Sequence, residues 1–169
     1  MTARDDTRGA AASVAVGPGD GGPTAVPAAA AWLGAAGLIP FVGLAFAAVL
    51  LADRLQMQAV LALAGYGAVI LSFLGGVHWG LTTAQPGSVE MDRRLMAAVV
   101  PSLIGWSALL MPAQTGLLVL ALAFAGLLLF DLRAVRRGHA PAWYPRLRWP
   151  LTVVVVASLV FGAVGRTVV

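Results

Sequence analysis

The sequence contains no cysteine and no lysine, and it has only two histidines. Without cysteine the chain can form no disulfide, thiolate metal site, iron–sulfur cluster or thiol nucleophile. Two histidines are too few to favour a metal site or a bis-histidine haem site made by this chain alone, so we expect neither a metal nor a cofactor. Most of the arginines border apolar stretches and form no broad basic surface, so we expect no nucleic-acid partner.

Charge is also scarce, since 60% of the 169 residues are apolar and only 11% are charged. An ordinary soluble domain is about 45–50% apolar and about 25% charged. The charges fall in clusters and leave uncharged windows at residues 21–52, 55–89, 95–130 and 149–165. Such windows are typical of helices that cross a lipid bilayer. The sequence therefore predicts an all-α integral membrane protein.

Five membrane-spanning helices result when the windows are cut into lengths of about 20 residues, which cross a hydrocarbon core of about 30 Å. The third window is too long for one helix, and the run Met111-Pro112-Ala113-Gln114-Thr115-Gly116 predicts a tight turn within it. Pro150 suits the first turn of the last helix. Residues 28–169 then form one domain, with helices at about 28–51, 60–81, 93–111, 114–131 and 150–167.

Residues 1–27 are predicted to be a disordered cytoplasmic tail. The run Gly17-Pro18-Gly19-Asp20-Gly21-Gly22-Pro23 interrupts any helix, and the stretch before it is only weakly apolar. That stretch lacks the apolar run of a secretory signal, and its aspartates are unlike a mitochondrial transit peptide. We therefore interpret it as neither kind of leader.

The arginines predict the orientation of the domain. An odd number of spans places the termini on opposite faces, and cytoplasmic loops carry the excess of basic residues. Nine of the eleven arginines fall on the face that holds the N-terminal tail and the connections 82–92 and 132–149, when Arg93 and Arg94 at the adjoining helix end are assigned to it. Only Arg54 and Arg166 fall on the other face. The sequence therefore predicts a cytoplasmic N-terminus and an external C-terminus.

Small side chains recur at every fourth position of the helix predicted at 60–81. Such a stripe lets a second helix approach closely, although alanine and glycine are also simply abundant in this chain. The partner helix is either part of this chain, part of another membrane protein or part of a second copy. This small-residue stripe consists of Ala64, Ala68, Ser72, Gly76 and Gly80.

Two prolines lie inside predicted spans and are predicted to kink them. Pro40 leaves the carbonyl of Ala36 without its usual donor, and Pro101 does the same to Ala97. A freed carbonyl can line a transport pathway, but passive bundles contain such kinks too. We favour the structural interpretation.

His78 is the ionisable side chain placed most clearly inside a predicted span, about three residues from its cytoplasmic end. Intramembrane ionisable groups pair with one another and often mark functional sites. Asp131 and arginines of the following loop are expected at the same depth. His78 then either hydrogen-bonds a loop or takes part in proton relay or ligand binding. The candidate functional cluster consists of His78, Asp131, Trp143, Tyr144, Arg146 and Arg148.

The sequence offers no case for an enzyme, and we assign no catalytic residue. Ser72 and His78 are six positions apart, about 600° of helical rotation, so they point to different faces. Ser102 would reach His78 only across the bundle, and nothing in the spacing requires it. No P-loop, zinc-protease motif or paired-carboxylate arrangement occurs inside the spans.

One run carries a family likeness, Gly75-Gly76-Val77-His78-Trp79-Gly80, and it is joined by Val100-Pro101-Ser102-Leu103, Asp131 and Trp143-Tyr144. With these residues the chain resembles domain-of-unknown-function family 3429, whose eukaryotic members are transmembrane protein 69-like proteins. The likeness covers roughly residues 31–165. It implies a small multi-pass protein of the bacterial plasma (inner) membrane, with mitochondrial relatives in eukaryotes, and it implies no activity.

Two functional hypotheses follow. The first is a non-enzymatic protein that packs against or helps to assemble another membrane complex, supported by the small-residue stripe and the shortage of buried polar groups. The second is a small transporter or proton-coupled permease that uses His78 and Asp131 near the cytoplasmic face. A polar cavity reaching the bilayer midplane would favour the transporter. A dry bundle with exposed glycines would favour the assembly role.

Overall fold

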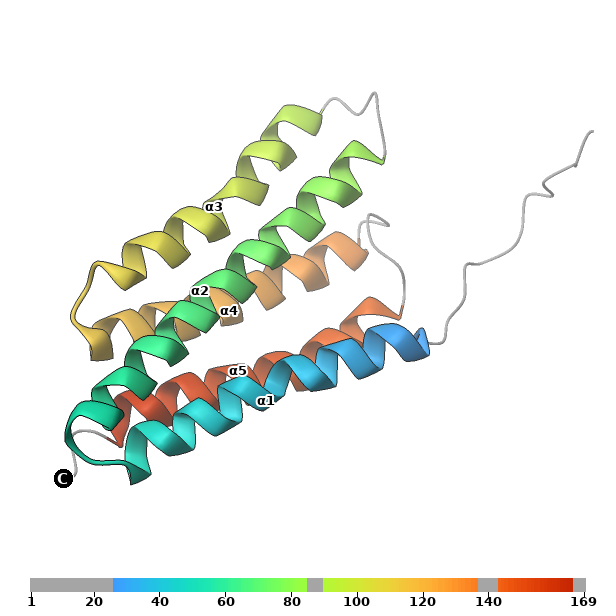
Figure 1. Ribbon diagram of the computed structural model, residues 1–169. Helices are drawn as coiled ribbons and strands as arrows, with labels where there is room; N and C mark the ends of the chain where they lie inside the picture. Colours follow the sequence, from blue (N-terminus) through green and yellow to red (C-terminus); the bar gives the residue numbers. More distant parts are fainter. Residues whose placement is uncertain (1–25, 85–89, 137–142, 166–169) are drawn as a thin grey trace, which may run out of the picture.

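The computed structural model describes residues 26–84, 90–136 and 143–165, and all regular structure in these ranges is α-helical (Figure 1). The predicted all-α fold is confirmed for this part of the chain. Of the predicted tail, residues 1–25 lie outside the described residues. The helices are α1 (Ala28–Leu50), α2 (Asp53–Thr83), α3 (Met91–Leu109), α4 (Ala113–Arg136) and α5 (Tyr144–Val164).

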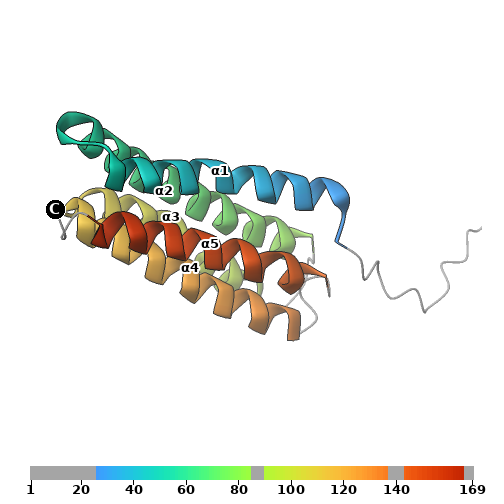
Figure 2. The ribbon, with the colours of Figure 1, turned by 90° about the horizontal axis from the view of Figure 1, so that it is seen from below.

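Successive helices run in opposite directions and form one bundle (Figures 1 and 2). α2 contacts all the other helices, α1 also contacts α5, and α4 contacts α3 and α5. At one end of the bundle α1, α3 and α5 begin and α2 and α4 end, and we name it the polar end. The opposite end holds the connections from α1 to α2 and from α3 to α4, and we name it the turn end.

Four helices are long and apolar enough to cross a membrane, namely α1, α2, α5 and, within α4, Ala113–Arg133. α3 is not among them, because its first turn carries Asp92, Arg93 and Arg94. The uncharged remainder, residues 95–109, is about 22 Å long at 1.5 Å per residue. A helix is therefore present where the third span was predicted, and its apolar part is shorter than the other four.

Two helices begin at least six residues earlier than predicted. α2 begins at Asp53 instead of about residue 60, and α5 begins at Tyr144 instead of about residue 150. Pro150 consequently lies inside α5, and Pro145 occupies the first turn that was expected for Pro150. The predicted boundaries were set by the thickness of a hydrocarbon core. A helix, however, continues beyond the core as long as its backbone hydrogen bonds persist.

The connection between α1 and α2 consists only of Leu51 and Ala52. Asp53 then has a φ of 52°, a left-handed conformation in which Asp is enriched. The side-chain amide of Gln56 donates a hydrogen bond to the carbonyl of Ala48 at 3.1 Å, which satisfies one of the carbonyls left open where α1 ends. The tight turn explains why α2 starts so early.

Aliphatic and aromatic side chains from α1, α2, α4 and α5 build the core. Phe41, Leu63, Phe124 and Leu159 are each at most 1% exposed. The ring of Phe41 meets Tyr66 and Phe124 edge to face, with centroids 4.9 and 6.0 Å apart. Such pairs add directional contact to the burial of apolar area.

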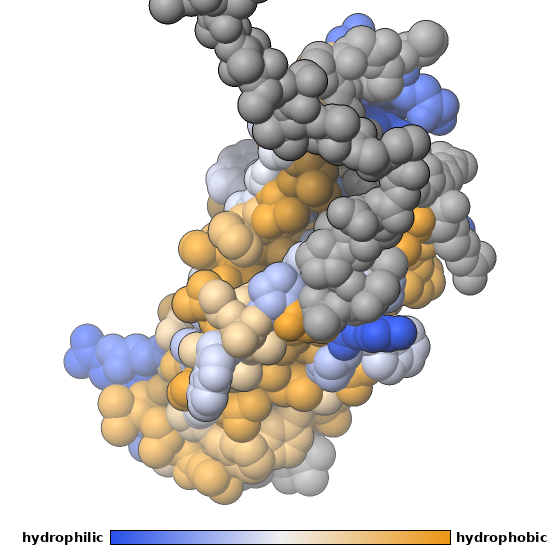
Figure 3. All heavy atoms as spheres, turned by 90° about the vertical axis from the view of Figure 1, so that its right-hand side faces the viewer, coloured by the Kyte–Doolittle hydropathy of each residue, from blue (hydrophilic) through white to orange (hydrophobic). Residues whose placement is uncertain are grey.

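The outside of the bundle is apolar as well, as the orange helix sides in Figure 3 show. Trp32, Phe73 and Leu122 have exposed fractions of 77%, 65% and 73%. A helix that is apolar all round belongs in a large core or in a membrane. The described bundle is too small to provide the first, so its surface is that of a membrane protein.

The two prolines that were predicted to lie inside spans do so, Pro40 inside α1 and Pro101 inside α3. The hydroxyl of Tyr66 donates to the carbonyl of Gly37 at 3.0 Å, beside the Ala36 carbonyl that Pro40 leaves without its usual donor. α2 thus supplies a polar contact next to the irregular part of α1.

Candidate functional site

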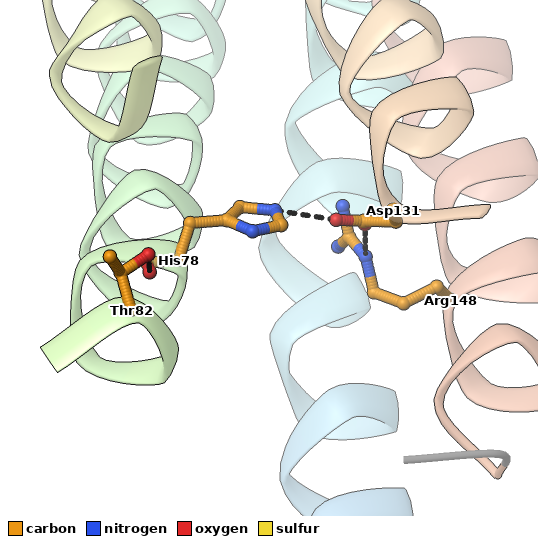
Figure 4. Close-up of polar contacts among 4 residues, drawn as sticks. All are labelled: His78, Thr82, Asp131 and Arg148. Carbon is orange, nitrogen blue, oxygen red and sulfur yellow. Dashed lines mark hydrogen bonds and ion pairs between the residues drawn. The ribbon is translucent and has the colours of Figure 1, made fainter. Parts of the chain in front are cut away.

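Three polar side chains from three helices meet inside the polar end of the bundle (Figure 4). His78 comes from the last turns of α2, Asp131 from the last turns of α4 and Arg148 from the second turn of α5. All three are buried, and Asp131 is only 1% exposed. The antiparallel order of the helices explains the meeting, because it brings the ends of α2 and α4 to the start of α5.

Asp131 uses both of its carboxylate oxygens. Oδ1 lies 2.6 Å from Nε2 of His78, and Oδ2 lies 2.7 Å from Nε of Arg148. These are the short distances of charge-assisted hydrogen bonds. A carboxylate only accepts hydrogen bonds, so the tautomer of His78 that fits carries its proton on Nε2. We name these three residues the Asp131 network.

The Asp131 network brings opposite charges together where isolated charges would be expensive. Burying an unpaired ion in an apolar interior costs on the order of several kcal/mol, even after its surroundings relax. The guanidinium of Arg148 balances the carboxylate of Asp131, and His78 satisfies the second oxygen. The network therefore joins α2, α4 and α5 by polar contacts at the polar end.

Two further groups frame His78. The hydroxyl of Thr82 donates to the backbone carbonyl of His78 at 2.9 Å, and the ring of Phe130 lies edge-on to the imidazole with centroids 5.0 Å apart. Neither residue was predicted from the sequence as part of the site. Thr82 could have been found from its spacing, because it follows His78 by four positions and residues i and i+4 lie on one helical face.

Two polar atoms beside the network have no hydrogen-bond partner within the described residues. They are Nη2 of Arg148 and Oγ1 of Thr152, which lie one turn apart on α5. Both residues are buried, with exposed fractions of 6% and 3%. This part of α5 therefore carries two buried polar atoms whose hydrogen bonds the described neighbours do not satisfy.

The structure brings three members of the candidate functional cluster into direct contact, namely His78, Asp131 and Arg148. The other three lie at the start of α5 without a hydrogen bond or ion pair to the network among the described residues, although Tyr144 is near enough to interact electrostatically with Asp131 and Arg148. The rings of Trp143 and Tyr144 meet at 6.0 Å, and Arg146 is exposed. Whether the cluster has a function beyond its contacts stays a prediction.

The small-residue stripe divides into a buried and an exposed part. Ala64 and Ala68 are buried and Ser72 is partly buried, whereas Gly76 and Gly80 are exposed. A Cβ added at either glycine would meet nothing within 4 Å. The stripe thus leaves the interior of the bundle as it approaches the polar end.

The closest approach of α2 to α3 depends on two glycines outside the stripe. A Cβ at Gly75 would lie 2.5 Å from the carbonyl oxygen of Ala98, and a Cβ at Gly105 would lie 3.1 Å from that of Ala68. The buried face of α2 therefore passes from Ala68 to Gly75. A strict four-residue period does not follow this face, since a helix has 3.6 residues per turn.

An apolar groove of about 410 Å³ lies between α2, α3 and α4. His78 is the polar residue among the side chains that line it, and Pro101 is one of the apolar ones. Within the described residues, no group of three or more His, Cys, Asp or Glu side chains is placed to hold a metal ion. The groove suits an apolar occupant better than an ion or a sugar.

Comparison with known proteins identifies relatives of this chain. Residues 26–164 match the family described as "Protein of unknown function (DUF3429)". Transmembrane protein 69 of Xenopus tropicalis is 38% identical over 145 residues, which cover 84% of this chain and 56% of that protein. Transmembrane protein 69 of Mus musculus is 28% identical over 135 residues, which cover 79% and 55%. The chain thus spans about half the length of these curated relatives, and no solved structure matches it.

Proposed function

This chain belongs to the DUF3429 family of proteins of unknown function, as its resemblance predicted, and we propose its role from the geometry of its helices and the positions of its charges. The description of the family names no activity. The protein is a non-enzymatic packing or assembly partner of another membrane complex in the bacterial inner membrane. It crosses the bilayer five times, with a cytoplasmic N-terminus and an external C-terminus. Three features support this proposal, namely the antiparallel bundle with its arginines, the exposed glycines of α2 and the largely apolar lining of the groove.

The proposed topology rests on the antiparallel bundle and on the arginines. All the helices lie side by side in one antiparallel bundle, so we take α3 to cross the bilayer with the others (Figure 1). Arg93, Arg133, Arg146 and Arg148 lie at the polar end, whereas Arg54 lies at the turn end. Basic residues favour the cytoplasmic side, so the polar end faces the cytoplasm.

Reporter tags at the two termini test this topology. Tags on the N- and C-terminus should be accessible to impermeant reagents from opposite sides of a sealed membrane. If both tags react from the same side, the five-span proposal is wrong and the polar end cannot be assigned by this count.

The exposed glycines carry the proposal of an assembly role. Gly76 and Gly80 lie one turn apart on the outer side of α2, with nothing within 4 Å of an added Cβ. Phe73 beside them is 65% exposed. We name these three residues the glycine face. A flat surface beside a large aromatic side chain allows another transmembrane helix to approach closely, and such close packing drives helix association in lipid.

A transporter that uses His78 and Asp131 is less well supported. The side chains of His78 and Asp131 hydrogen-bond each other, and Asp131 also pairs with Arg148. The other residues that line the groove next to His78 are apolar. A transporter needs a polar site that reaches the bilayer midplane. The orphan atoms of Arg148 and Thr152 are the observation that favours this alternative.

Single-cysteine crosslinking tests the assembly role cleanly, because the natural chain has no cysteine. A cysteine that replaces Gly80 should give a crosslinked product of one defined mass in native membranes. A cysteine that replaces Gly43 is the matched control, since Gly43 is exposed on α1 and also has nothing within 4 Å.

A second variant separates specific packing from random collision. The double variant Gly76→Leu/Gly80→Leu should fold, because the space at both positions is open, but it should no longer form the complex. Gly43→Leu should retain it. Equal crosslinking at positions 43 and 80, or a complex unchanged by the double variant, would contradict the assembly role.

A further inference from the structure

The groove between α2, α3 and α4 has a clear direction. On α3 it is lined by Ala97, Val100 and Ile104, and on α4 by Leu122, Gly126 and Phe130. These stretches are about 10–12 Å long at 1.5 Å per residue. Phe130 and His78 mark the end of the groove nearest the polar end.

On α3 and α4, an arginine follows the groove-lining residues toward the polar end. Arg93 precedes Ala97 by four positions, and Arg133 follows Phe130 by three, so each lies on the groove-lining stripe of its own helix. Both arginines are exposed, and neither forms an ion pair within the described part of the chain. The helical stripes that line the groove on α3 and α4 thus each continue to an arginine on the side of the polar end.

We propose that this groove binds one acyl chain of an anionic glycerophospholipid, whose phosphate lies between Arg93 and Arg133. Anionic headgroups are attracted by arginines close to the membrane surface. The 10–12 Å of apolar wall matches most of the acyl depth of one leaflet, which is half of a hydrocarbon core of about 30 Å. A lipid is the occupant whose polar and apolar parts are arranged in this order.

The lining and the size of the groove both suit a hydrocarbon chain. Apart from His78 the lining side chains are apolar, and a volume of about 410 Å³ lies within the range of pockets that hold small molecules.

Gly126 provides a way to fill the groove without disturbing the fold. It lines the groove, and a Cβ added there would meet nothing within 4 Å. The full chain would be placed in nanodiscs of phosphatidylcholine with about one tenth phosphatidylglycerol, extracted gently, and its bound lipids counted by native mass spectrometry. We expect one retained phosphatidylglycerol for the unaltered chain and about tenfold lower retention for Gly126→Leu.

Arginine variants test the headgroup part of the proposal. Arg93→Gln/Arg133→Gln should reduce the preference for phosphatidylglycerol over phosphatidylcholine by about tenfold, since each basic residue near the surface adds to the attraction. Arg54→Gln, an exposed arginine at the turn end, should leave the preference unchanged. Gly43→Leu, on an exposed part of α1, should leave lipid retention unchanged.

Each possible result decides the question. Retention that is unaffected by Gly126→Leu, or reduced equally by Gly43→Leu, would mean non-specific lipid association and would overturn the proposal. Retention of phosphatidylcholine and phosphatidylglycerol in their bulk ratio would overturn the role of the arginines. Helix content and melting temperature, measured on each variant, confirm that losses come from the groove. The result is independent of whether the glycine face binds a partner.

Discussion

The two ends of the bundle are held together in different ways. At the turn end, α1 and α2 are joined by two residues, and α3 and α4 by residues 110–112. Gly116 there lets α4 approach so closely that an added Cβ would collide with the carbonyl oxygen of Ala108. At the polar end, α2 and α3 are joined through 84–90, α4 and α5 through 137–143, and the buried Asp131 network lies between the helices.

This difference shows what each kind of contact can do in an apolar surrounding. Short turns fix the spacing of consecutive helices, and close contact of small residues then needs no polar group. The Asp131 network joins α4 to the consecutive helix α5 and also to α2, which is not consecutive with α4, since His78 and Asp131 are 53 residues apart in sequence. Apolar packing gains little from lipid exclusion in a membrane, so directional hydrogen bonds give the polar end its specific arrangement.

Removing the centre of the Asp131 network should have the largest effect. Asp131→Ala leaves the guanidinium of Arg148 buried without its counter-ion, and we expect a loss of about 3–5 kcal/mol in the free energy of unfolding. Unfolding in mixed micelles of mild detergent and dodecyl sulfate, followed by circular dichroism, measures it. Asp92→Asn, an exposed change at the same end, is the control.

If Asp131→Ala unfolds like the unaltered protein, the polar end is not held by its network, and the comparison between the ends fails. The double variant Asp131→Leu/Arg148→Leu sharpens the result. It removes both charges together, so it should be clearly more stable than Asp131→Ala.

Disturbing the turn end should have the next largest effect. Gly116→Ala places a methyl group against the backbone of Ala108, which cannot move as a flexible side chain can. We expect a loss of about 1–3 kcal/mol, as for other overpacked sites. Gly126→Ala, at an open position on the same helix, should be neutral or slightly stabilising, because alanine favours helix. A neutral Gly116→Ala would contradict the importance of close packing at this end.

Much of the fold was predictable from hydropathy alone. α1 and α4 begin at Ala28 and Ala113, within one residue of the predicted starts, because uncharged windows and turn residues mark these boundaries directly. The starts of α2 and α5 were wrong by several residues. Charged and polar residues such as Asp53 and Arg148 were assigned to connections, but they are helical because local hydrogen bonds and packing, and not hydropathy, decide where a helix begins.

The site was predictable only in part. His78 and Asp131 both lie near the cytoplasmic ends of their predicted spans. The sequence therefore predicted that the two side chains would lie at the same depth in the membrane. It did not distinguish Arg146 from Arg148, since two positions on a helix differ by about 200° and the start of α5 was unknown. The groove escaped prediction altogether, because it arises from the relative positions of three helices.

The cap of the turn between α1 and α2 should make a smaller contribution. Gln56→Ala removes the hydrogen bond to the Ala48 carbonyl, and we expect a loss of about 1 kcal/mol. Gln58→Ala, an exposed change in the same part of α2, is the matched control. Equal stability of the two variants would mean that the short connection alone holds this turn.

The last effect concerns the orphan hydroxyl at the polar end; it is no larger than that of the cap, and its sign is opposite. Thr152→Val keeps the shape of the side chain and removes a buried hydroxyl that has no partner within the described residues, so we expect a gain of about 1 kcal/mol. Thr82→Val is the matched control, because the Thr82 hydroxyl donates to the His78 carbonyl, and this change should give no gain. Both are read from the same unfolding curves. A loss of stability with Thr152→Val would mean that the Thr152 hydroxyl and Nη2 of Arg148 have hydrogen-bond partners in the membrane that the described residues do not supply. The polar end would then be a binding site as well as a structural contact.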